Sequence, residues 1–161
     1  MTNFFDGYVQ GERNNYQGNI GFRFTAVQDF EIHRLGRGSR GTLNETTVVT
    51  IWEVSTENSI GSVSVGPSST LDGDYHYEDL ENPIAITAGK EYSITQLCSN
   101  GMTPWNDATL TNNQVPWLSD YADVGVGVYT NSAAYPSSES QVGRWTSVVT
   151  FYIAIPGTAI S

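Results

Sequence analysis

The sequence predicts an all-β protein, a two-sheet antiparallel β-sandwich of jelly-roll type formed by one domain over residues 1–161. Apolar and polar residues alternate in many short segments, as they do in strands that cover one side of a core. No long window keeps apolar residues at helical spacing, and glycine or proline turns separate the segments at short intervals. A hydrophobic content of 39% in 161 residues is enough for one core.

The alternation predicts the strands in order along the chain. Their apolar positions fall at residues 22–24, 30–32, 49–51, 63–65, 84–86, 92–94, 124–128 and 149–155. The last of these is the longest clean alternation. Between 84–86 and 92–94 the turn at Ala88-Gly89-Lys90 predicts a hairpin over residues 83–97, with Gly89 as the turn residue.

The segment 124–128 alternates valine with glycine, because Gly125 and Gly127 separate Val124, Val126 and Val128. Glycine inside a strand usually marks a bulge or a strong twist. The alternative is a stripped face that another chain or a ligand approaches closely. Both interpretations stay open at this point.

The charge balance excludes several classes of partner. Asp and Glu number 17 against 7 Lys and Arg, and a net charge of -10 repels nucleic acid and anionic membranes. No apolar stretch approaches the ~20 residues that span a bilayer, so we expect no membrane insertion. Cys98 is the single cysteine, which excludes an intrachain disulfide and a zinc site of paired cysteines.

The location is predicted from weaker signals. Ser and Thr are abundant while Lys90 is the single lysine, a surface that is familiar among exported proteins. Residues 1–10 lack the basic and apolar regions of an export signal. We expect an extracellular or cell-surface protein.

Four segments carry a resemblance to a known family. They are Gly-Phe-Arg-Phe-Thr at 21–25, Phe-Glu-Ile-His-Arg-Leu-Gly at 30–36, Val-Thr-Ile-Trp-Glu at 49–53 and Pro-Ile-Ala-Ile-Thr-Ala-Gly-Lys-Glu-Tyr at 83–92. In this order they resemble an uncharacterised β-sandwich domain family of bacterial exported and surface proteins, including PEP-CTERM-sorted ones. The resemblance covers residues 20–94 and implies a sandwich fold and an extracellular origin. It implies no catalytic residues, and it ends before Ser99.

Catalysis is not expected. Hydrolysis needs a nucleophile beside a base, or a pair of carboxylates at a defined separation. The two histidines, His33 and His76, accompany no nucleophile motif such as Gly-x-Ser-x-Gly. We therefore predict a protein that is not an enzyme.

The sharpest local feature is a repeated Pro-Trp pair in the long polar stretch 99–123. Sugar sites combine aromatic rings with amide and carboxylate groups, so this stretch predicts a non-catalytic carbohydrate-binding, lectin-like adhesion module. The alternative is that both indoles fold back and close the end of the sandwich. The predicted ligand-binding residues are Trp105, Asn106, Asp107, Trp117, Asp120 and Tyr121.

Calcium is a further predicted ligand. The segment 72–79 sets four carboxylates around a turn, and oxygen ligands in a loop suit Ca²⁺. The spacing is not that of an EF-hand, so a solvated turn is the alternative. The predicted metal ligands are Asp72, Asp74, Glu78 and Asp79.

A second function stays open, a self-assembling structural subunit of a surface layer, filament or virion. The glycine-faced segment 124–128 would then meet a neighbouring copy in a homo-oligomer. Residues 1–18, predicted to be flexible or to contact a partner, and the apolar tail 155–160 would reach a neighbour's sheet.

Overall fold

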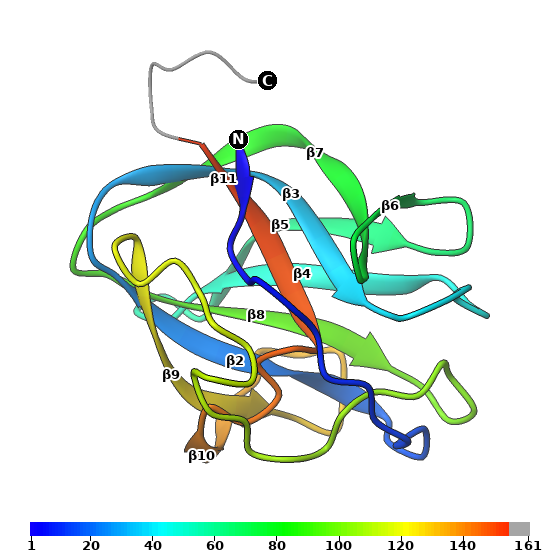
Figure 1. The fold of residues 1–161 in the computed structure, drawn as a ribbon. Coiled ribbons are helices and arrows are strands. Elements are labelled where there is room, and N and C mark those ends of the chain that lie inside the picture. Colours follow the sequence, from blue (N-terminus) through cyan, green and yellow to red (C-terminus); the bar gives the residue numbers. More distant parts are fainter. Residues whose placement is uncertain (155–161) are drawn as a thin grey trace.

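A computed structural model describes residues 1–154 and contains no α-helix among them. Two antiparallel sheets pack face to face, which confirms the predicted β-sandwich (Figure 1). None of the described residues forms a helix long and apolar enough to cross a membrane. The strands are β1 (Thr2–Asn3), β2 (Gly18–Ala26), β3 (Phe30–Gly38), β4 (Thr47–Glu53), β5 (Asn58–Val65), β6 (Thr70–Asp72), β7 (Tyr75–Ile86), β8 (Glu91–Cys98), β9 (Ala122–Tyr129), β10 (Ser138–Val142) and β11 (Val149–Ala154).

The strand order is that of a jelly roll. One sheet runs β1-β11-β3-β7-β6 and the other runs β10-β9-β2-β8-β4-β5. The sets β1-β11-β3-β7 and β2-β8-β4-β5 interleave along the chain, so each sheet pairs early strands with late ones. Residues 99–148, between β8 and β11, add β9 and β10 beside β2, near the bottom of Figure 1.

The core lies where the alternating apolar side chains of the two sheets meet. Phe24 of β2 lies 5.1 Å, between ring centroids, from Phe151 of β11 in the opposite sheet. Phe4 stacks on Phe151 at 4.5 Å. Burial of such rings contributes roughly 1.5–3 kcal/mol each, so this aromatic contact is a main link between the sheets.

The predicted hairpin over residues 83–97 is wrong. Gly89 is the turn residue, with φ of 84°, but β7 and β8 belong to different sheets. Both edges of β8 are occupied by β2 and β4, so no edge remains for β7. The turn crosses between the sheets instead, held by Gly89 N donating to the carbonyl of Ala26 at 2.8 Å.

The glycine-rich strand β9 is bulged, as one of the two interpretations predicts. The register between β2 and β9 shifts between Phe22 and Phe24. β9 pairs with β2 on one edge and β10 on the other, so its backbone offers no free edge to a neighbouring copy. A Cβ on Gly127 would lie 2.9 Å from the Trp145 ring, so the close approach at this glycine comes from the same chain.

The N-terminal segment packs on its own chain. Figure 1 shows this segment, in blue, running from β1 beside β11 down to the start of β2. Phe4, Phe5 and Tyr8 are buried, and the Tyr75 hydroxyl donates to the Gly7 carbonyl at 2.9 Å. The apolar tail 155–160 predicted to reach a neighbour lies outside the described residues.

Candidate ligand-binding site

The first Pro-Trp pair is folded into the protein. Trp105 is 1% exposed, and its backbone pairs with that of Arg13. Its ring has no free face for a sugar, so the alternative interpretation of an indole that closes the sandwich describes this residue. The Asn106 side chain bonds the protein's own backbone, because its amide nitrogen donates to the carbonyl of Gln10 at 3.2 Å.

The second Pro-Trp motif packs against a different part of the N-terminal segment. The Trp117 backbone pairs with that of Phe5, and the two rings meet edge-on with their centroids 6.5 Å apart. Tyr121 is half-buried against Phe30, while Asp120 is exposed. Trp105 pairs with Arg13 and is buried, whereas Trp117 pairs with Phe5, so the two Pro-Trp motifs do not build one exposed platform.

The four predicted calcium ligands do not converge either. Glu78 and Asp79 are consecutive residues of β7, and consecutive strand residues point to opposite faces of a sheet. Asp79 accepts a hydrogen bond from Arg34 at 2.6 Å, whereas Asp72 ends β6 and Asp74 lies in the turn before β7. Residues 1–154 contain no group of three or more His, Cys, Asp or Glu placed to hold a metal. Calcium binding stays a prediction from the sequence.

Asp107 is the one predicted ligand residue at the centre of a polar cluster. Its Oδ1 accepts from Trp145 Nε1 at 2.9 Å and from Arg144 Nη2 at 3.2 Å. Its Oδ2 accepts from Arg13 Nη1 at 2.7 Å. Burial raises the pKa of this carboxyl, but the hydrogen bonds from Trp145, Arg13 and Arg144 outweigh burial and hold the pKa below its usual value.

These partners of Asp107 form one wall of a cleft with a volume of about 280 Å³. The Arg13 guanidinium lies over the Tyr16 ring at 5.3 Å, and the Arg144 guanidinium lies over the Trp145 ring at 5.2 Å. Tyr129 meets Trp145 edge-on at 5.5 Å. We call this the arginine cleft, and its lining residues are Arg13, Tyr16, Ile20, Tyr129, Ser140, Arg144 and Trp145.

The backbone at Trp145 is strained. Its φ of 61° lies in the left-handed region, which a bulky side chain rarely adopts. The hydrogen bond to Asp107 and the space left by Gly127 hold the indole in this position. Strain of this kind clusters at binding sites, because the surrounding structure must maintain it.

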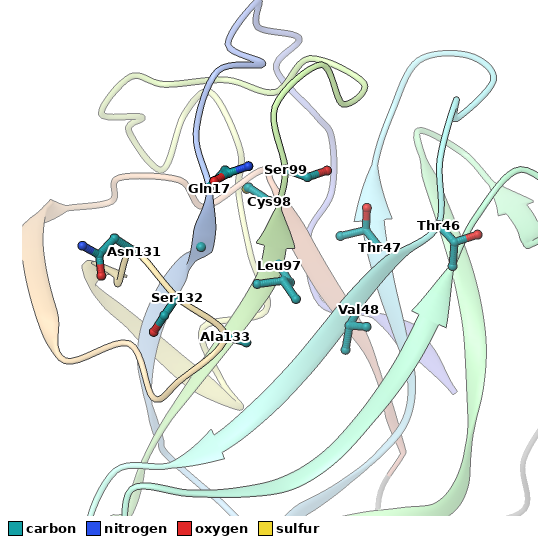
Figure 2. A pocket seen from close by; sticks show the side chains of 11 residues that line it. Gln17, Thr46, Thr47, Val48, Leu97, Cys98, Ser99, Asn131, Ser132 and Ala133 are labelled. Atoms are coloured by element: carbon teal, nitrogen blue, oxygen red, sulfur yellow. The ribbon is translucent and has the colours of Figure 1, made fainter.

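A second hollow, with a volume of about 430 Å³, is lined in part by Gln17 and Gly18 (Figure 2). Its walls are Asn131–Ala133 on one side and Thr46–Val48 on the other, with Leu97–Ser99 between them. Burial raises the pKa of the Cys98 thiol at its floor to about 12. We call it the threonine hollow, and its lining residues are Gln17, Gly18, Thr46, Thr47, Val48, Leu97, Cys98, Ser99, Asn131, Ser132 and Ala133.

Comparison with known proteins adds no relative, because a scan against protein-family models gives no match to this chain and a search of curated proteins gives none. The resemblance of residues 20–94 therefore stays a prediction. The arginine cleft lies outside that range except for Ile20. Its residues come from the N-terminal segment, β2, β9, β10 and the turn after β10.

Sequence reasoning missed the arginine cleft almost entirely. It singled out the two Pro-Trp motifs, whereas Trp145, which is 5% exposed, is not preceded by proline and belongs to neither motif. Arg13 and Arg144 stand 131 positions apart in the sequence (144 minus 13) and carry no local motif. The one available signal was Asp107, which the sequence did single out and which ties both arginines together.

Proposed function

We propose that the protein is a non-catalytic carbohydrate-binding module whose ligand site is the arginine cleft. The observation that carries the proposal is the juxtaposition of half-exposed Tyr16 and Tyr129 with the guanidinium groups of Arg13 and Arg144. Sugar rings present C–H groups that pack on aromatic rings and hydroxyls that need hydrogen-bond partners. The cleft supplies both kinds of contact in one place.

A binding role also agrees with the placement of the reactive groups. Within the described part of the chain, the residues that line the arginine cleft include no His, Cys, Asp or Glu. The Asp107 carboxylate behind them accepts three side-chain hydrogen bonds, from Arg13, Arg144 and Trp145. A carboxylate held in this way orients its donors and is a poor general base, so we assign it a positioning role.

The test is a glycan array followed by calorimetry on the hits, with Tyr16→Ala as the site variant. Tyr121→Ala is the matched control, because this half-buried tyrosine belongs to the site predicted from the sequence and lies outside the cleft. We expect binding to fall about tenfold or more in Tyr16→Ala and to persist in Tyr121→Ala. Silence of the wild-type protein across diverse glycans overturns the proposal.

One observation favours assembly as a second function. β5 ends its sheet, and within residues 1–154 it pairs with β4 alone. Its sequence, Asn-Ser-Ile-Gly-Ser-Val-Ser-Val, contains no charge and no proline, which are the usual protection of an edge strand. The occupant of this edge would be the β5 strand of a second copy, paired antiparallel about a two-fold axis.

Light scattering coupled to size exclusion tests assembly at physiological salt, where the charge of -10 is screened. Ser62 is exposed on β5, so Ser62→Lys places a like charge at the contact of two copies. We expect a dimer that becomes a monomer in this variant. A wild-type protein that stays monomeric at high concentration contradicts assembly.

A further inference from the structure

The chemistry of the arginine cleft narrows the class of sugar, and this inference rests on the proposed function. Arg13 and Arg144 share the single carboxylate of Asp107, so these three groups carry an excess of one positive charge. The chain as a whole has a charge of -10 and only 7 Lys and Arg residues. A local positive excess in such a protein marks a place where an anion is favoured.

Both guanidinium groups keep hydrogen-bonding capacity. Arg13 donates through Nε to Asn15 and through Nη1 to Asp107, and its Nη2 donates to no acceptor among the described residues. Arg144 donates through Nη2 to the backbone carbonyl and the carboxylate of Asp107, and its Nη1 donates to no acceptor among the described residues. An unsatisfied donor next to a cleft gains most from an ionised oxygen acceptor.

The two groups are also held in place before any ligand arrives. Each is tied to Asp107 and lies over an aromatic ring, Arg13 over Tyr16 and Arg144 over Trp145. Side chains fixed in this way lose little further conformational entropy on binding. A planar guanidinium fork matches the two oxygens of a carboxylate, whereas it has no such match with a lone hydroxyl.

We infer that the arginine cleft binds a sugar bearing one carboxylate, such as a hexuronic acid residue at the end of an oligosaccharide. The carboxylate would meet the free guanidinium donors and the ring C–H groups would pack on Tyr16 and Tyr129. The volume of about 280 Å³ is at the low end for ligand pockets and suits one ring. Exposed Glu12 lies next to Arg13, and both line a third hollow, so a second carboxylate on the ligand is disfavoured.

The experiment compares methyl β-glucuronide with methyl β-glucoside, which differ in the group at C6, by titration calorimetry on the whole chain. We expect the glucuronide to bind about tenfold more tightly or better. The site variants are Arg13→Gln and Arg144→Gln, each of which removes the preference for the glucuronide. Unfolding curves identify any variant that fails to fold, and the other variant then carries the test.

Arg34→Gln is the matched control. Arg34 also lies over a tyrosine ring, Tyr152 at 5.3 Å, and bonds an aspartate, Asp79, but it lies outside the cleft. This variant has the same net charge as the site variants and keeps the preference. Equal binding of the two sugars, or binding of neutral glycans alone, overturns the inference and leaves the proposed function standing. No binding of any glycan on the array overturns both.

Discussion

The arginine cleft and the threonine hollow are both lined in part by residues 16–20, but their other lining residues differ in chemistry. Tyr16 and Ile20 line the cleft, whereas Gln17 and Gly18 line the hollow. The hollow is larger, at about 430 Å³ against about 280 Å³, but among residues 1–154 no charged side chain and no aromatic ring lines it. Volume alone therefore does not identify a binding site, and the placement of charges and rings favours the smaller cleft.

The arginine cleft and the threonine hollow also differ in what stabilises their walls. The wall of the threonine hollow is tied to a buried arginine, because Arg37 Nη1 donates to Thr47 Oγ1 at 2.9 Å and pairs with Glu45. The wall of the arginine cleft depends on Asp107, which is partly exposed to solvent. Breaking each network should thus have different consequences for the fold and for binding.

The largest effect is expected from Arg37→Met, which leaves the Glu45 carboxylate without its buried partner. Arg37 is 1% exposed, and breaking such a pair costs about 3–5 kcal/mol of unfolding free energy. Urea unfolding measures it. Lys90→Met has the same charge change at an exposed ion pair with Glu53 and should cost less than about 1 kcal/mol. Equal losses in the two variants would contradict the structural role of Arg37.

The next effect is expected from Asp107→Asn, which weakens three hydrogen bonds and frees both arginines of the cleft. We expect a loss of about 1.5–3 kcal/mol at pH 7, together with weaker glycan binding. Because the folded-state pKa of Asp107 lies below its ordinary value of 3.8, its contribution is present above that pH and is lost as the pH falls through the folded-state pKa. Denaturant curves at pH 7 and pH 3 check this. A difference between wild type and variant that grows at pH 3 would contradict it.

A smaller effect is expected from Gly127→Ala. Its Cβ would lie 2.9 Å from the Trp145 ring and 2.9 Å from Arg144 Cβ, so both cleft residues must move, at a cost of about 1–3 kcal/mol. Gly125→Ala is the control in the same strand, since its Cβ meets only the Arg23 carbonyl, at 3.5 Å. Thermal unfolding should show a loss for the first variant and a change within about 0.5 kcal/mol for the second. A larger stability loss in Gly125→Ala than in Gly127→Ala would contradict the role of Gly127 in positioning Trp145 and Arg144.

The smallest effect concerns the floor of the threonine hollow. Burial raises the pKa of the Cys98 thiol to about 12, so the reactive thiolate is strongly disfavoured at pH 8. We expect negligible reaction with a colorimetric disulfide reagent in the native protein and one reactive thiol in denaturant. Rapid reaction of the native protein would contradict this expectation, because it would show that the threonine hollow opens and gives the reagent access to Cys98.

The sequence predicted the strands well because their signal is local. Alternation at Phe22 and Phe24, or at Phe151 and Ile153, is visible within a few neighbouring residues. The same reasoning failed at Gly89, where the turn was correct and the pairing was not. Pairing depends on which strand edges are already occupied, and those edges belong to residues far along the chain.

The candidate site shows the same division more sharply. Asp107 was predicted to bind the ligand, yet in the structure its carboxylate accepts hydrogen bonds from Arg13, Arg144 and Trp145 of the same chain. The Pro-Trp motif attracted attention because Trp105 is next to polar groups in sequence, while in space its ring lies in the core. Proximity in sequence therefore misled where the chain folds back on itself.

By itself the sequence determined the all-β class, the sandwich and most strand positions, because period-two alternation is written into consecutive residues. Only the tertiary structure decided the sheet order and the composition of the arginine cleft. The physical reason is that the cleft joins segments from both ends of the chain, Arg13 and Tyr16 with Tyr129 and Arg144, through contacts that exist only after the sheets have packed.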